Sequence, residues 1–173
     1  MTSRRRTLYL LRHAKSSWSD EQLADRDRPL APRGEDAVMR LRRYVGDAEI
    51  SPELVLCSSA RRTVMTLDGI APAFPAGTTV LVEDGLYGAP SERLLGRVSE
   101  VDDGVTSVML IGHNPGLEVL ATLLVGGGDE ALRRRLETKF PTGALAELAV
   151  ATRWRDLTPA DATLESFVVP RDL

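Results

Sequence analysis

A short apolar run that ends in a cation and a histidine lies near the start of the sequence. Residues 8–11 (Leu-Tyr-Leu-Leu) are followed directly by Arg12 and His13. A run of this length indicates a buried strand of a parallel sheet. In open α/β sheets, the residues that follow a parallel strand lie at the edge where ligands bind. We therefore expect Arg12 and His13 at the mouth of a binding site.

The only other histidine of the chain occupies the same position relative to a strand. His113 follows the apolar run 108–111 and Gly112. Because the carboxyl ends of parallel strands meet at one edge of a sheet, the pattern predicts that the two imidazoles lie close together.

Apolar runs and amphipathic segments alternate along the rest of the chain. Strands are expected at residues 52–57, 79–83, 107–112 and 144–151, with a possible edge strand at 154–157 and an extended tail. Residues 125–128 (Val-Gly-Gly-Gly) indicate a flexible break. Strands that alternate with helices predict a three-layer α/β/α fold, with a mostly parallel central sheet flanked by helices on both faces.

Residues that favour helix starts mark where the intervening helices begin. The expected starts are Pro32 as first helical residue, Ser58 or Ser59 as a cap, Ser91 as a cap, Asn114 as a cap before Pro115, and Asp129 as a cap. Residues 12–32 show no convincing periodicity and form a loop longer than compact domains usually contain. We expect this loop to form a rim over the site, with Trp18 as either a lid contact or simple packing.

Length and composition exclude several classes of protein. The 173 residues are expected to form a single domain, 1–173, and the net charge of −3 gives no reason to expect nucleic acid or an anionic membrane as partner. The triplet Arg4-Arg5-Arg6 is expected to be a solvated terminus. The apolar run after it is too short for a signal peptide. One cysteine, Cys57, forbids an internal disulfide and fits a reducing, cytoplasmic compartment.

Two adjacent arginines follow the second expected strand. Arg61 and Arg62 lie in the first turn of a helix, where a cation opposes the helix dipole unless an anion binds alongside. Arginine suits bidentate contact with phosphate oxygens. Together with Arg12, one of them would bind a dianion. Histidine can attack phosphorus, and a second imidazole, if protonated, can stabilise the charge on the phosphoryl oxygens.

These residues resemble the histidine phosphatase superfamily, which includes phosphoglycerate mutases. Arg12-His13-Ala14 resembles its Arg-His-Gly signature. More narrowly, four blocks resemble SixA-type protein phosphohistidine phosphatases. They are residues 12–18 (RHAKSSW), 28–30 (RPL) with Gly34, 112–116 (GHNPG) and 140–144 (FPTGA). The blocks are in order and cover nearly the whole chain.

The resemblance implies a role for each residue of the expected site. His13 would be the nucleophile, Arg12 and an arginine of the second block would bind the phosphate, and His113 would complete the pocket. The family's second block reads serine, three residues, arginine, three residues, threonine, which Ser58, Arg62 and Thr66 fit and Arg61 does not. No metal and no other cofactor is implied, and the implied partner is a phosphorylated protein or a small phosphorylated substrate.

Two features depart from the family pattern. Ala14 replaces the usual glycine, and would be strained if its φ had to be positive. Mutase-like members carry a glutamate in the third block; Glu83 matches one frame, whereas Tyr87-Gly88 points to Asp84. Glu83 is the expected general acid, with Asp84 or no acid as alternatives, since an imidazole or a good phosphate ester needs less protonation on leaving.

Other readings fit the sequence less well. A cysteine phosphatase needs a cysteine and an arginine separated by five residues. In this chain, the position at that distance from Cys57 is Thr63. A zinc site needs three or four clustered ligands, which two histidines without further partners do not supply. A non-catalytic phospho-ligand binding module would need the arginines but not His13. A small-molecule phosphatase or mutase of the same superfamily is the remaining alternative, although no large insertion is present to build a closed lid.

Overall fold

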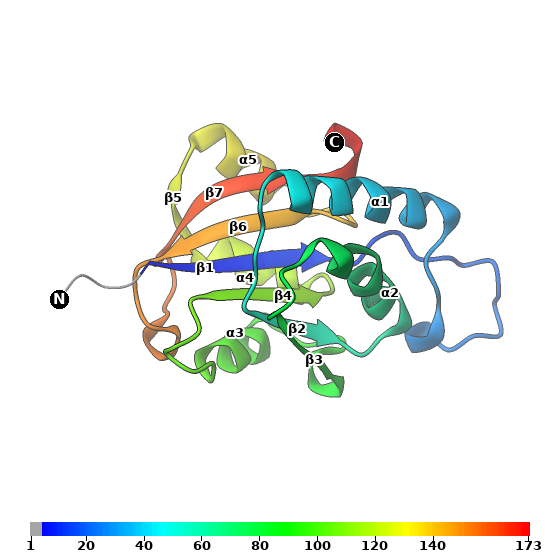
Figure 1. Cartoon of the computed structure of the whole chain (residues 1–173), viewed down its shortest axis with the longest axis horizontal. Coiled ribbons are helices and arrows are strands. Elements are labelled where there is room, and N and C mark those ends of the chain that lie inside the picture. The colour runs from blue at the N-terminus through cyan, green and yellow to red at the C-terminus, as the bar shows by residue number, and fades with distance from the viewer. Residues whose placement is uncertain (1–4) are drawn as a thin grey trace.

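In the described residues, 5–173, seven strands form one sheet in the order β3-β2-β4-β1-β6-β7-β5 (Figure 1). The computed structural model gives their bounds as β1 (Arg6–Arg12), β2 (Leu54–Ser58), β3 (Thr79–Glu83), β4 (Ser107–Gly112), β5 (Val125–Gly128), β6 (Leu145–Val150) and β7 (Ala162–Val168). Strands β3, β2, β4 and β1 are parallel, and β5 is parallel to β7. Only β6 runs antiparallel to both of its neighbours in this sheet. The predicted, mostly parallel sheet is confirmed.

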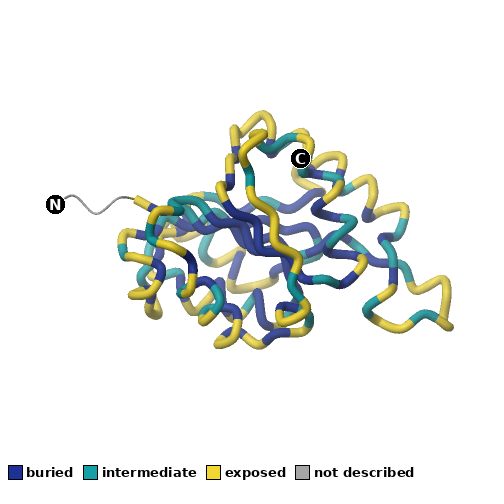
Figure 2. The backbone as a smooth tube through the Cα atoms, turned by 60° about the horizontal axis from the view of Figure 1, so that its bottom comes forward, coloured by how far each residue is buried: buried dark blue, intermediate teal, exposed yellow. Residues whose placement is uncertain are grey.

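Helices cover both faces of the sheet, as predicted. Their bounds are α1 (Pro32–Asp47), α2 (Arg61–Ile70), α3 (Ser91–Ser99), α4 (Gly116–Leu124) and α5 (Glu130–Thr138). Alternate residues of each central strand point to opposite faces. Tyr9 and Leu11 of β1 pack in one core with α1 and α2, whereas Leu8 and Leu10 pack in the other core with α3 and α4. Figure 2 shows the resulting buried central strands beneath more exposed helices and loops.

Helix starts agree with the sequence at some positions and differ at others. Helix α1 begins at Pro32, and Asp129 Oδ1 caps α5 by accepting from the amides of residues 131 and 132. The predicted Ser58 or Ser59 cap of α2 is wrong, because Ala60 is the N-cap and no side chain caps this helix. Ser91 is the first residue of α3, not its cap.

The predicted cap of α4 is also wrong. This helix begins at Gly116 with Pro115 as its N-cap. The side chain of Asn114 instead donates from Nδ2 to Glu118 Oε2 (3.1 Å) and to the carbonyl of Phe140 (2.9 Å). The amide of Asn114 therefore links two loops at the sheet edge.

The C-terminal third holds two differences from the sequence prediction. Residues 125–128 form β5, not a flexible break, since Gly126 has no side chain to keep the Ala160 carbonyl away. The possible edge strand at 154–157 is instead a 3-10 turn, Trp154–Asp156, with the Trp154 ring fully buried and its Nε1 donating to Val105 O (2.7 Å). Within the expected extended tail, β7 pairs with β6.

Of the predicted basic triplet, Arg5 is exposed and Arg6 is buried. Arg4 lies outside the described residues. Arg5 pairs with Glu165 at the surface. Arg6 is only 5% exposed and donates to the carbonyls of Thr152 and Asp103. The prediction of a solvated side chain is therefore wrong for Arg6. Within residues 5–173, no helix is both long and apolar enough to cross a membrane. The cytoplasmic location stays a prediction.

Candidate active site

The two histidines follow neighbouring strands that are paired in register. Arg12 at the end of β1 lies opposite Gly112 at the end of β4, and the His13 amide donates to the Gly112 carbonyl (3.2 Å). The ring centroids of His13 and His113 are 5.2 Å apart, and the residues are 7% and 8% exposed. The sheet edge thus brings the two rings together, as the strand pattern predicted.

Hydrogen bonds fix the protonation of the His13 ring. Its Nδ1 is 2.7 Å from the Ala14 carbonyl, which can only accept, so Nδ1 carries the proton. Its Nε2 accepts from Nε of Arg62 at 3.4 Å and therefore holds a lone pair. The pKa of His13 is lowered to about 3, mainly by burial and in smaller part by nearby His113, Arg62 and Arg12, while the hydrogen bond to the Ala14 carbonyl opposes this shift. At neutral pH, Nε2 is therefore unprotonated and holds a free lone pair.

His113 is held as the opposite tautomer. Arg62 Nη2 donates to its Nδ1 (3.3 Å), so Nε2 carries the proton and donates to Ser58 Oγ (2.7 Å). Burial lowers the pKa of His113 to about 4, and the charge of Arg62 contributes to this. A phosphate dianion between the rings would raise the pKa of both histidines, since an opposite charge favours the charged form. His113 could then donate to a phosphoryl oxygen.

The Ser58, Arg62 and Thr66 frame connects three parts of the site. Arg62 is 6% exposed and contacts both imidazoles, whereas Arg61 is exposed to solvent. One helical turn later, Thr66 Oγ1 donates to the Arg62 carbonyl (2.7 Å) and accepts from the Ala14 amide (3.0 Å). Ser58 binds His113. The spacing that distinguished Arg62 from Arg61 therefore has a structural cause.

The backbone around His13 is unstrained. Positive φ among the described non-glycine residues is confined to Glu49 and Ala160, so Ala14 does not need a glycine conformation. Gly143 does need one, with φ of 77°, because its amide donates to the carbonyls of both Arg12 (3.1 Å) and His13 (3.0 Å). The segment 140–144 thus fixes the end of β1.

Arg12 is anchored by the same segment. Its Nη1 donates to the Phe140 carbonyl (3.0 Å), which also accepts from Asn114 Nδ2. Glu118 accepts from the Phe140 amide (3.2 Å) and from Asn114, and so orders both. The charged group of Arg12 lies at the cavity with a fixed orientation.

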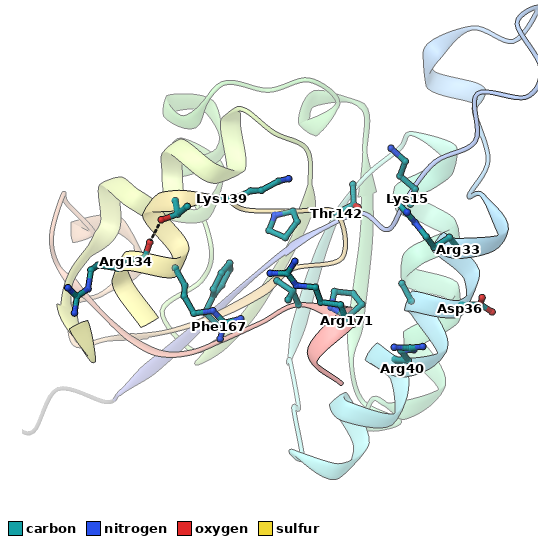
Figure 3. Close-up of a pocket in the computed structure, with 15 residues that line it drawn as sticks. Lys15, Arg33, Asp36, Arg40, Arg134, Lys139, Thr142, Phe167 and Arg171 are labelled. Atoms are coloured by element: carbon teal, nitrogen blue, oxygen red, sulfur yellow. Dashed lines mark hydrogen bonds between the residues drawn. The ribbon is translucent and has the colours of Figure 1, made fainter. Parts of the chain in front are cut away.

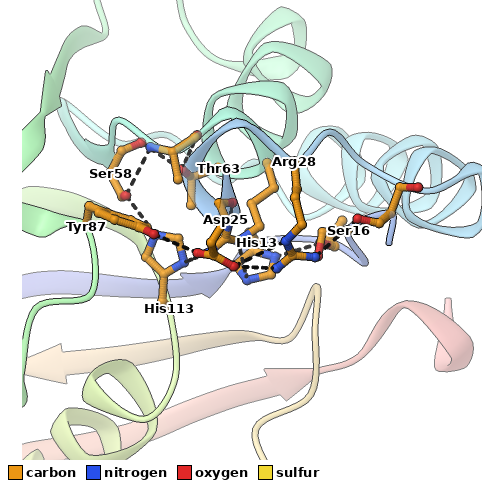
Figure 4. A network of polar contacts seen from close by, with 12 residues as sticks. His13, Ser16, Asp25, Arg28, Ser58, Thr63, Tyr87 and His113 are labelled. Carbon is orange, nitrogen blue, oxygen red and sulfur yellow. Dashed lines mark hydrogen bonds and ion pairs between the residues drawn. The ribbon is translucent and has the colours of Figure 1, made fainter. Parts of the chain in front are cut away.

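Sequence reasoning missed Asp25, which lies in the 3-10 turn Asp25–Asp27 of the long loop (Figure 4). Its Oδ2 accepts from Tyr87 Oη (2.6 Å) and Arg62 Nη2 (3.1 Å), and its Oδ1 accepts from Arg28 Nη2 (2.9 Å). The Tyr87 hydroxyl and the two guanidiniums hold the pKa of Asp25 far below its usual range. The charged run 25–28 was visible in the sequence, but its partner was not.

The structure does not bring Glu83 or Asp84 to the histidines. Glu83 ends the edge strand β3, and its carboxylate is occupied by Arg97 of α3, with Nη2 at 2.8 Å and Nε at 2.9 Å. Asp84 is exposed and pairs with Arg26. Neither carboxylate lines the cavity beside His13.

That cavity has a volume of about 290 Å³ and is strongly basic. Its lining residues are Arg12, His13, Lys15, Ser16, Trp18, Arg28, Arg62, His113, Asn114 and Thr142. No acidic residue is among them in the described part of the chain. The exposed Trp18 ring stacks on the Arg28 guanidinium, with Arg28 Cζ 3.5 Å from the centroid of the ring. This tryptophan therefore forms part of the rim. The arrangement suits a small dianion held against Nε2 of His13.

Comparisons with known proteins show the family to which the chain belongs. The family model described as histidine phosphatase superfamily (branch 1) matches residues 8–99. An uncharacterized protein of Mycobacterium tuberculosis is 37% identical over 163 residues, which cover 93% of this chain and all of the relative. The chain belongs to the histidine phosphatase superfamily.

Two solved structures indicate which type within the superfamily the chain resembles in fold. A candidate phosphohistidine phosphatase SixA from Agrobacterium tumefaciens is 32% identical with a TM-score of 0.82, over 95% of this chain and 98% of the other. A candidate SixA from Nakamurella multipartitia is 28% identical with a TM-score of 0.85, over 98% and 99%. The fold and these structural matches therefore assign the chain to the SixA type of the superfamily.

Proposed function

We propose that the protein is a metal-independent phosphatase that works through a phosphohistidine intermediate on His13. One observation carries this proposal: Nε2 of His13 is unprotonated, faces a basic cavity, and lies beside a guanidinium that also contacts His113. A nucleophile and the groups that stabilise a transferring phosphoryl group are thus in one place.

The reaction has two displacements. In the first, the Nε2 lone pair forms a bond to phosphorus as the bond to the leaving group breaks, and the leaving group takes a proton from solvent. Arg12 and Arg62 bind the phosphoryl oxygens, and His113 donates to one of them. In the second, water adds to phosphorus as the Nε2–P bond breaks, and both water protons leave with the phosphate as H₂PO₄⁻. His13 regains its neutral form.

The surroundings of the cavity favour particular leaving groups. Among the described residues that line the cavity, no carboxylate is available to protonate a departing alkoxide. An imidazole or an acidic phenol departs without such help more readily than an alcohol does. This supports phosphohistidine protein or activated phosphomonoesters as substrates, and the similar SixA-type structures are described as candidate phosphohistidine phosphatases.

The test is hydrolysis of a phosphohistidine peptide, p-nitrophenyl phosphate and an alkyl phosphate by the wild type and by His13→Ala. We expect the first two to be hydrolysed, the third to be hydrolysed far more slowly, and all turnover to be lost in His13→Ala. Turnover retained in His13→Ala would refute the mechanism. Phosphate binding without turnover in the wild type would indicate a binding module, and rapid turnover of alkyl phosphates would indicate a small-molecule phosphatase or mutase.

A further inference from the structure

A second, larger cavity of about 800 Å³ lies beside the candidate active site. Figure 3 shows the residues that line it. Helix α1 forms one wall and α5 the other, and the floor is formed by the end of β7 and the 3-10 turn Pro170–Asp172. Lys15 and Thr142 line both this groove and the cavity at His13. A substrate held at His13 can therefore continue between these two residues into the groove.

The groove is basic although the chain has a net charge of −3. Lys15, Arg33 and Arg40 lie on the α1 side, and α5 and the segment after it supply Arg134, Arg135 and Lys139, with Arg171 at the floor. Asp36 is the one carboxylate among the described residues that line it.

Three of these seven cations have a partner of opposite charge. Arg135 and Arg171 both approach Asp172 (2.5 and 3.6 Å), and Arg134 pairs with Glu130 (3.4 Å) on the surface. In residues 5–173, the ion pairs do not include Lys15, Arg33, Arg40 or Lys139. Like charges repel across a groove, so this arrangement does not stabilise the fold. It is suited to attract an anionic ligand.

The spacing of the cations favours an extended anion. Arg33 and Arg40 are two helical turns apart, which is about 10 Å along α1 at 1.5 Å per residue. Cations spread over this length suit a chain of negative charges better than one phosphate. Beside Arg171, the floor of the groove is formed by the largely buried apolar residues Phe167, Val169 and Pro170.

We propose that this groove binds an acidic segment of the phosphorylated protein on which the enzyme acts. The proposal rests on the proposed phosphatase function, because it places the phosphoryl group of the same partner at His13. Lys15 lies at the junction of the two cavities, and charge complementarity along both walls selects a chain of carboxylates next to the phosphorylated residue.

The experiment uses two synthetic phosphohistidine peptides of equal length, one flanked by six Asp or Glu residues and one flanked by Ser and Gln. The groove variant is Arg33→Glu/Arg40→Glu. Its control is Arg42→Glu/Arg43→Glu, which changes the charge of the same helix equally at exposed positions outside the groove. p-Nitrophenyl phosphate, which is too small to reach the groove, reports on the catalytic centre alone.

We expect the wild type to prefer the acidic peptide by about tenfold in kcat/KM at low salt, with the preference reduced at high salt. The groove variant should lose the preference and the control should keep it, while both hydrolyse p-nitrophenyl phosphate as the wild type does. Equal rates for the two peptides, or equal losses in the two variants, would overturn the proposal. So would potent inhibition by inorganic tripolyphosphate that depends on Arg33 and Arg40 without any peptide preference, since the groove would then hold a small polyanion.

A direct binding measurement separates failure of this proposal from failure of the phosphatase function. The unphosphorylated acidic peptide, labelled with fluorescein, is titrated with wild type, groove variant and control by anisotropy. Binding that is weakened only in the groove variant supports the docking surface even if no substrate is hydrolysed. Absence of binding to the wild type contradicts the docking surface even if p-nitrophenyl phosphate is hydrolysed.

Discussion

Nε of Arg62 donates a hydrogen bond to Nε2 of His13 over 3.4 Å. Because a guanidinium stays charged at any working pH, this contact keeps the imidazole unprotonated on the side that faces the cavity. The same guanidinium reaches Nδ1 of His113 at 3.3 Å. Its N–H groups therefore point to the positions that phosphoryl oxygens would take between the two rings.

Arg62→Lys should reduce kcat for p-nitrophenyl phosphate by about 10²–10³-fold, the usual cost of losing one donor to transition-state charge. Lysine keeps the charge but lacks the planar fork that contacts both rings. The matched control is Arg61→Lys, one residue earlier and exposed, which should retain wild-type kinetics. Similar rates in the two variants would show that the fork of Arg62 does not matter.

Ser58 positions His113, and the hydrogen bonds of the described residues do not join it to His13. In Ser58→Ala the Nε2–H of His113 loses its acceptor, so we expect about a tenfold lower kcat/KM and a shift in the pH profile. Nitrogen NMR of the ring should show the Nε2–H tautomer in the wild type and a mixture in the variant. Ser59→Ala is the control, because the Ser59 hydroxyl accepts from Arg26 instead. An unchanged tautomer in Ser58→Ala would contradict the positioning role.

Asp25 has two opposing effects on anion binding. It orients Arg62 and Arg28, but its negative charge repels a phosphate. Asp25→Asn keeps acceptor and shape while removing the charge, so inhibition by inorganic phosphate should strengthen about fivefold, equivalent to about 1 kcal/mol. Asp25→Ala removes the orientation as well and should weaken inhibition. Weaker inhibition in Asp25→Asn would show that the negative charge itself is required.

The lowered pKa values of His13 and His113 make the fold sensitive to acid. An unfolded histidine binds a proton near its ordinary pKa of 6.5, whereas the folded rings do so only at about 3 and 4. The unfolded state thus binds more protons between these values, and the free energy of unfolding falls as the pH drops through this window.

Urea unfolding at about pH 7.5 and about pH 5 should show this loss, on the order of 2 kcal/mol for each ring. A His13→Asn/His113→Asn variant should lose much less over the same interval. Added phosphate should protect the wild type, because the bound dianion favours the protonated rings. Equal pH dependence in wild type and variant would contradict burial of neutral imidazoles.

The strand ends were predictable because a parallel register leaves little freedom. Once residues 8–11 and 108–111 form neighbouring parallel strands, His13 and His113 must follow at the same edge. The preference for Arg62 over Arg61 came from the family spacing. Its cause is the helical turn between Arg62 and Thr66, which points both side chains at the end of β1.

Contacts that depend on tertiary packing could not be predicted. Asp25 lies in a loop without periodicity, and only folding brings it to Arg62. Glu83 fits a sequence frame for a general acid, but the packing of α3 beside β3 gives its carboxylate to Arg97. The glycines 126–128 lack strand propensity, yet pairing with β7 makes them a strand.

The most direct measurement of the central claim is detection of the phosphorylated enzyme. The protein is mixed with phosphohistidine peptide or p-nitrophenyl phosphate, quenched in base, and analysed by intact mass and by fragmentation. We predict one added phosphoryl group, stable in base and lost in acid, on Nε2 of His13, and its absence in His13→Ala. A phosphoryl group on another residue, or steady turnover in His13→Ala, would contradict the account.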